Sequence, residues 1–92
     1  MEVSTQIQIK GISQKDFEAI FHEHYAHLCA YANKYVEDKD AAEELVQDVF
    51  FKLWVKRNEI NIQSSLKSYL FRAVRNASLN LLSHLKVREE YK

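Results

Sequence analysis

The segment from Asp40 to Trp54 (DAAEELVQDVFFKLW) constrains the fold more than any other part of the chain. Its apolar residues recur every three to four positions, so they fall on one side of a helix with 3.6 residues per turn. This stripe contains Ala42, Leu45, Val46, Val49 and Leu53. Asp40 is placed to cap the helix, and Glu43 follows three residues later, as in a capping box. The segment therefore predicts an amphipathic helix from Ala41 to about Arg57.

Two other segments show the same period. Ser13 can cap a helix from Gln14 to Val36, and a further helix is predicted from Leu66 to about Arg88. The single glycine and the absence of proline argue against a turn-rich all-β fold. We therefore predict an all-α fold, a small bundle of three long helices. The side chains expected at its centre are Phe17, Phe21, Leu28, Leu45, Val49, Leu53, Leu70 and Val74.

A chain of 92 residues is long enough for one domain. We place an N-terminal arm at residues 1–12 and the helical domain at residues 13–92. The spacing of Val3, Ile7 and Ile9 favours an extended segment in the arm, and a short extra helix or disorder are the alternatives. The one interior loop that we predict is NEINIQS, residues 58–64, after which Ser64 or Ser65 can cap the last helix.

Charge is distributed unevenly along the chain. Residues 1–65 contain 7 Lys/Arg and 11 Asp/Glu, a net charge of −4, whereas residues 66–92 contain 6 and 2, a net charge of +4. This asymmetry is compatible with one basic and one anionic partner. The single cysteine, Cys29, cannot form an intrachain disulfide, which fits a reducing cytoplasm. No apolar run reaches the roughly 20 residues of a membrane span, and we expect a cytoplasmic protein.

The polar side of the 41–57 helix carries uncovered apolar residues. Asp40, Glu44, Gln47 and Asp48 lie opposite the apolar stripe, but Phe51 and Val55 fall on this same polar side. Apolar groups framed by acids are typical of a surface that another protein covers. The alternative is an ordinary solvated acidic face.

The last helix has the composition of a nucleic-acid-binding surface on its polar side. Arg72, Arg75 and Lys86 can neutralise phosphates, and Ser68 can donate hydrogen bonds. Phe71 flanks this side and could stack on a base. Asn76 and Asn80 lie at its other border. The alternative is a solvated basic face on a bundle helix.

The two patterns AAEELVQDVFFKLW and SLKSYLFRAVRNASLNLL, in this order, resemble the region-two domain of extracytoplasmic-function sigma factors. The resemblance extends over roughly Asp16 to Arg88. It implies that the first pattern binds the coiled coil of the β′ subunit of core RNA polymerase. The polymerase-binding residues that it implies are Asp40, Glu44, Gln47, Asp48 and Phe51.

The resemblance also implies that the second pattern and the preceding loop bind promoter DNA, the non-template strand of the minus-ten element. In the family the loop helps to form a pocket for a flipped base, a role that falls here to Asn61, Gln63 and Ser64. The other DNA-binding residues predicted are Lys67, Ser68, Phe71, Arg72, Arg75, Asn76 and Asn80. We expect the family's C-terminal helix-turn-helix domain to be absent from this chain. An anti-sigma factor is a further partner that the family admits.

Two other classes of function, a metal site and an enzyme, fit the sequence less well. His22, His24 and His27 are close in sequence, but one helix cannot direct all three to one metal ion. Phosphate loops need several glycines, and no catalytic arrangement is visible. We therefore predict that the chain is not an enzyme and has no metal or cofactor. A helical adaptor that binds protein but not DNA stays open as the alternative.

Overall fold

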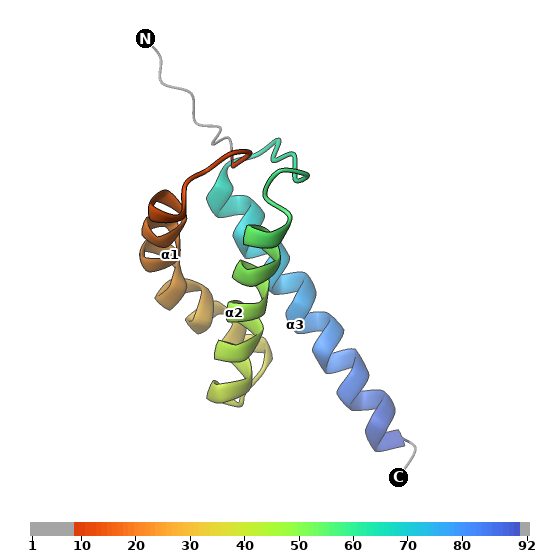
Figure 1. Cartoon of the computed structure of the whole chain (residues 1–92). Helices are drawn as coiled ribbons and strands as arrows, with labels where there is room; N and C mark the ends of the chain where they lie inside the picture. The colour runs from red at the N-terminus through yellow and green to blue at the C-terminus, as the bar shows by residue number, and fades with distance from the viewer. Residues whose placement is uncertain (1–8, 91–92) are drawn as a thin grey trace.

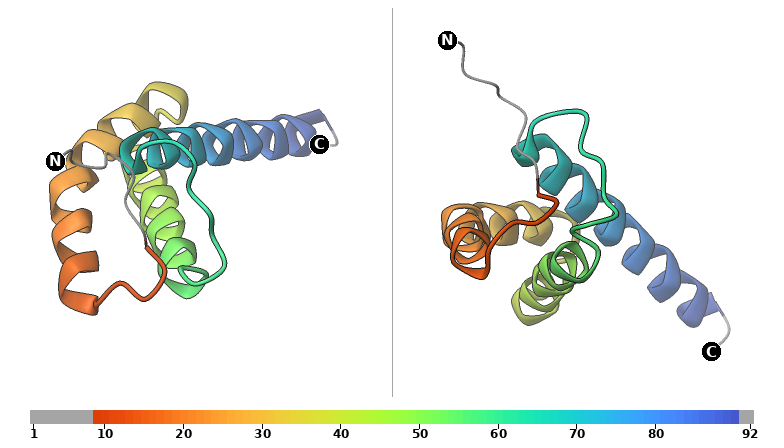
Figure 2. Two further views of the ribbon diagram at one scale, coloured as in Figure 1. Left: turned by 90° about the horizontal axis from the view of Figure 1, so that it is seen from above. Right: turned by 45° about the horizontal axis from the view of Figure 1, so that its top comes forward.

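The computed structural model describes the backbone of residues 9–90 and the side chains of residues 9–86. It contains three helices, α1 (Gln14–Tyr35), α2 (Lys39–Val55) and α3 (Leu66–Glu90), and the predicted all-α fold is confirmed. α1 and α2 are antiparallel neighbours, and each of the three helices packs against the other two (Figure 1). The domain measures 57 × 23 × 22 Å, and the C-terminal half of α3 extends beyond the other helices (Figure 2).

The first and last helices begin where their capping serines predict. The Ser13 hydroxyl accepts a hydrogen bond from the Asp16 backbone N–H at 3.1 Å. At the start of α3, the Ser65 hydroxyl accepts one from the Ser68 N–H at 3.0 Å. Of the two serines that could cap α3, Ser65 is therefore the one that does so, because an N-cap oxygen must reach the N–H group three residues later.

The predicted start and end of α2 are wrong. Asp38, not Asp40, is the cap, and its Oδ1 accepts hydrogen bonds from the N–H groups of Asp40 at 2.9 Å and Ala41 at 3.2 Å. The three residues from Val36 to Asp38 suffice to reverse the chain after α1, so α2 starts at Lys39 instead of Ala41. It ends at Val55 because the chain then enters a turn.

Asp38→Ala is expected to lower the free energy of unfolding by about 1 kcal/mol, because two backbone N–H groups lose their acceptor. Asp40→Ala is the control, since Asp40 contributes only a favourable charge in the first turn. Urea unfolding followed by circular dichroism measures both. At about 1 M salt, where charge effects are screened, the loss for Asp38→Ala should persist. Equal losses for the two variants in high salt would contradict the assignment of the cap.

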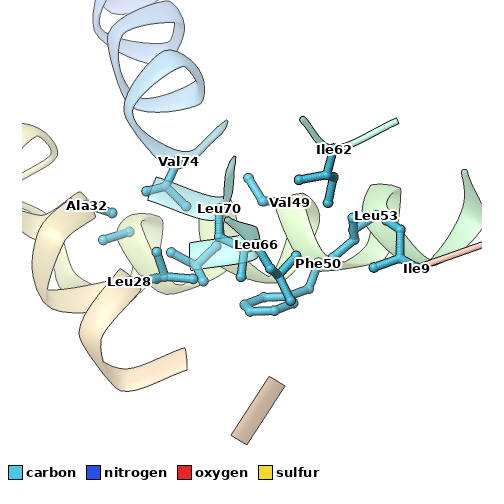
Figure 3. Close-up of a cluster of buried hydrophobic side chains, with 12 residues drawn as sticks. Ile9, Leu28, Ala32, Val49, Phe50, Leu53, Ile62, Leu66, Leu70 and Val74 are labelled. Carbon is cyan, nitrogen blue, oxygen red and sulfur yellow. The ribbon is translucent and has the colours of Figure 1, made fainter. Parts of the chain in front are cut away.

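The core lies where the three helices meet (Figure 3). Its buried side chains are Ile9, Leu28, Ala32, Ala42, Val46, Val49, Phe50, Leu53, Ile62, Leu66, Leu70 and Val74. Phe50 is 2% exposed although it was not among the predicted core residues. Three residues expected at the centre, Phe17, Phe21 and Leu45, pack around the cluster and are only partly buried.

The N-terminal segment contributes to this core at its end. Residues 1–8 of the predicted arm lie outside the described residues, but Ile9 is 3% exposed and Ile12 packs against the cluster. Gly11 adopts a φ of 76°, a left-handed conformation that glycine reaches without strain. Residues 9–12 are therefore part of the packed bundle.

Candidate functional site

The outer side of α2 carries the acidic and apolar groups that the sequence predicts. Asp40, Glu44, Gln47 and Asp48 are all exposed, and Phe51 is 65% exposed. Val55, one turn further, is 55% exposed. Because α2 contacts both other helices through its opposite side, these groups stay available to a partner. We call the five residues Asp40, Glu44, Gln47, Asp48 and Phe51 the α2 face.

Two members of the α2 face already have intramolecular partners. Asp48 forms an ion pair with Lys52 at 3.1 Å, in which both side chains are more than half exposed. Such an exposed i,i+4 pair contributes only about 0.3–0.5 kcal/mol and can be exchanged for an intermolecular pair. The Gln47 amide donates a hydrogen bond to the Tyr25 hydroxyl at 3.0 Å, which ties α2 to α1. Among the described side chains, neither Asp40 nor Glu44 forms an ion pair.

A shallow groove of about 470 Å³ continues the α2 face toward α3. Glu44 and Asp48 line it from α2, and Asn80, Leu81 and His84 line it from α3. Asn80 was predicted to bind DNA. It lies on the side of α3 that faces α2, in the groove with the acidic residues Glu44 and Asp48.

The loop between α2 and α3 forms a second hollow, of about 410 Å³. We call it the loop hollow, and it is lined by Asn61, Ile62, Gln63, Ser64, Tyr69 and Arg72. Ile62 is 9% exposed and anchors the loop in the core, whereas Asn61 and Gln63 on either side of it are exposed. The three predicted base-reading residues are therefore brought together, with an arginine from α3 beside them.

The aromatic residue of the loop hollow is Tyr69, which was not predicted. We expected Phe71 to offer its ring for stacking, but Phe71 is partly buried and packs edge-on against Tyr31 of α1, with ring centroids 4.9 Å apart. Tyr69 precedes Arg72 by three residues and therefore lies on the same side of α3. This spacing was the signal in the sequence that could have identified it.

The remaining predicted DNA-binding residues lie along the first half of α3. Lys67, Ser68, Arg72, Arg75 and Asn76 are exposed. Within the described side chains, none of the three basic residues has an ion-pair partner, so their charges are available to an anion. The Ser65 hydroxyl donates a hydrogen bond to the Ser68 hydroxyl oxygen at 2.9 Å, which leaves the Ser68 hydroxyl proton free to donate to a ligand.

The described histidines and Cys29 lie on or near α1 and α3 without converging as metal ligands would. Within residues 9–86, no group of three His, Cys, Asp or Glu side chains is placed to hold a metal ion. Burial raises the pKa of the Cys29 thiol, which disfavours the nucleophilic thiolate at neutral pH.

None of the three described helices combines the length and hydropathy that a membrane span needs.

The family model described as sigma-70 region 2 matches residues 20–87, which include most of α1, all of α2 and the loop, and most of α3. The chain belongs to the sigma-70 region 2 family. This family consists of non-catalytic transcription factors that act at initiation, with core RNA polymerase and promoter DNA as partners. No curated protein and no solved structure is significantly similar to the chain.

Both surfaces fall within the residues that the sigma-70 region 2 model matches. The exposed basic residues of α3 lie within the same matched residues. The α2 face lies on α2, whereas the loop hollow lies on the α2–α3 loop and the start of α3, within one packed bundle (Figure 1).

Proposed function

We propose that this sigma region 2 domain binds the β′ coiled coil of core RNA polymerase through the α2 face and reads the unwound minus-ten element through the loop hollow and α3. The observation that carries the proposal is the exposure of Phe51, framed by carboxylates on the side of α2 that the bundle leaves uncovered. Burying such an apolar residue against a partner stabilises a complex, and the carboxylates steer a basic partner into register.

The composition of the loop hollow supports the DNA part of the proposal. Amide and hydroxyl groups of Asn61, Gln63 and Ser64 can bond to base edges, and Tyr69 offers a ring on which a base can stack. Arg72 at the rim can neutralise a phosphate. A hollow with these groups suits a single base extruded from the strand, a step that costs a few kcal/mol.

The two patterns quoted above further suggest the extracytoplasmic-function subclass, whose members work on polymerase in the cytoplasm. With the small contact area of one domain, DNA binding by the free chain is expected to be weak and strongly salt-dependent. Binding to core polymerase supplies further contacts, so the complex with core polymerase is the appropriate material for DNA measurements.

Reversing two charges of the α2 face tests the polymerase contact. Glu44→Lys combined with Asp48→Lys is expected to weaken binding to the β′ coiled coil about tenfold or more, because like charges then face each other across the interface. Titration calorimetry with core polymerase or its coiled-coil fragment measures the affinity. Folding should be unaffected, since only the exposed ion pair of Asp48 is lost.

The matched control is Glu23→Lys combined with Glu37→Lys, two exposed carboxylates outside the α2 face. This control has the same net charge as the test variant and should bind like the parent. Parental affinity in the test variant, or an equal loss in the control, would show that the α2 face is not the docking surface. An adaptor without a DNA role would leave labelled minus-ten oligonucleotides unbound even when core polymerase is present.

A further inference from the structure

We propose that residues Ile9–Ile12 act as a brace that sets the shape of the loop hollow, with Asn58 and Ile9 as positioning residues for base recognition. The proposal rests on the proposed function, because it assigns the brace a role in reading the minus-ten element. Segment 9–13 and the α2–α3 loop lie over the same end of the bundle in both figures of the whole chain (Figures 1 and 2).

The first contact of the brace is a hydrogen bond between two segments that are far apart in sequence. The Gly11 backbone N–H donates to the Asn58 Oδ1 at 2.9 Å, across 47 positions of the chain. A turn closed by the Ile12 N–H and the Ile9 carbonyl at 3.1 Å presents this donor. The turn depends on the positive φ of Gly11, which an L side chain rarely adopts.

The second contact is apolar. Ile9 and Ile62 belong to the same buried cluster, with exposures of 3% and 9%, and Ile9 lies beside Leu53 at the end of α2 (Figure 3). Ile62 is the residue of the α2–α3 loop that lines the loop hollow and is also buried in this cluster. Truncating Ile9 would therefore leave a cavity in the cluster that also holds Ile62.

Contacts within the loop itself fix only its two ends, so the middle of the loop depends on contacts from other segments. At the start, Arg57 stacks on the Trp54 ring, 3.7 Å from its centroid, and the Glu59 and Ile60 N–H groups bond to the Lys56 carbonyl. At the end, Ser65 caps α3. For residues 61–64, which line the loop hollow, the described part of the chain supplies no backbone–backbone hydrogen bond.

Side-chain anchors therefore determine how Asn61, Gln63 and Ser64 are presented. A loop that is already ordered loses less conformational entropy when it binds a base, and it rejects an ill-fitting base more strongly. Loss of the brace should reduce discrimination between bases more than it reduces overall affinity, since the phosphate contacts of Arg72 and Arg75 remain.

The test variant is Asn58→Ala, which removes the acceptor of the Gly11 N–H. Asn58→Asp retains a side-chain oxygen for this bond and should preserve the parental behaviour. The matched control is Asn33→Ala, which removes hydrogen bonds to the Val36 and Glu37 carbonyls at the other end of the bundle. Ile9→Ala tests the apolar contact separately.

The primary measurement is the affinity ratio between a minus-ten oligonucleotide and one with a substituted base, with the domain bound to core polymerase. Asn58→Ala should reduce this ratio about three- to tenfold, as expected for losing one hydrogen bond, whereas affinity for the β′ coiled coil should not change. Hydrogen exchange of the amides of residues 58–65 in the free chain should become faster in Asn58→Ala and in Ile9→Ala, but not in Asn33→Ala.

The brace would be overturned if Asn58→Ala kept both the affinity ratio and the hydrogen-exchange rates of the parent. It would also be overturned if Asn33→Ala lost as much discrimination between the oligonucleotides as Asn58→Ala. If the parent with core polymerase does not discriminate between the oligonucleotides, the proposed function fails and base positioning fails with it. The exchange measurement then still decides whether residues 9–12 order the loop.

Discussion

Phe50→Ala is expected to lower the free energy of unfolding by about 3–5 kcal/mol, because it removes a buried ring and leaves a cavity between helices. Phe50 is 2% exposed, and its ring lies edge-on to Phe21 at 4.9 Å and to Phe17 at 6.2 Å. A domain of this size has a total stability of about 5–14 kcal/mol. The substitution should therefore lower the melting temperature by more than about 10 °C, as measured by circular dichroism.

The adjacent residue provides the matched control. Phe51→Ala removes the same ring from a site that is 65% exposed, so stability should change by no more than about 0.5 kcal/mol. The same variant should weaken binding to the β′ coiled coil, since the ring contributes to the proposed interface. If Phe51→Ala destabilised the chain as much as Phe50→Ala, the burial assigned to these two neighbours would be wrong.

Tyr69→Ala is expected to weaken binding of the minus-ten oligonucleotide by about 1–3 kcal/mol, roughly 5- to 150-fold, if a base stacks on this ring. Tyr69→Phe keeps the ring and should stay close to the parent. Fluorescence anisotropy with the domain bound to core polymerase, well below the melting temperature of each variant, measures the affinity.

Phe71→Ala separates stacking from packing. Like Tyr69, Phe71 is partly buried and packs against the core, but its ring contacts Tyr31 and does not line the loop hollow. We expect a loss of stability with little change in affinity for the oligonucleotide. An affinity loss in Phe71→Ala that equals or exceeds the loss in Tyr69→Ala would return the stacking role to Phe71.

Most of the predicted surface residues are exposed in the structure, because helical period alone places them opposite the apolar stripe. Glu44, Asp48 and Phe51 share the uncovered side of α2, and Arg72 lies on the exposed side of α3. Their roles in binding stay proposals. The period was less informative for Asn80, since a border position can belong to either neighbouring surface, and the packing of α2 against α3 placed it in the groove beside Glu44.

The boundaries of α2 show a different limit of sequence reasoning. Both Asp38 and Asp40 are competent caps, and a local pattern cannot state how many residues the chain needs to reverse direction. That number depends on how closely α1 and α2 pack, and the three residues 36–38 sufficed. The same holds for Phe50, whose burial requires α1 to present Phe17 and Phe21 on the facing side.

The helical class, the three segments, and the opposite charges of the first 65 and last 27 residues follow from the sequence by itself. These properties are local, because each depends on residues within a few positions of one another. The contact between Gly11 and Asn58, the burial of Ile9 beside Leu53, and the packing of the Phe71 ring against Tyr31 depended on the tertiary structure. Each of these three contacts is between residues that are distant in the chain, and only the packing of the helices brings such residues together.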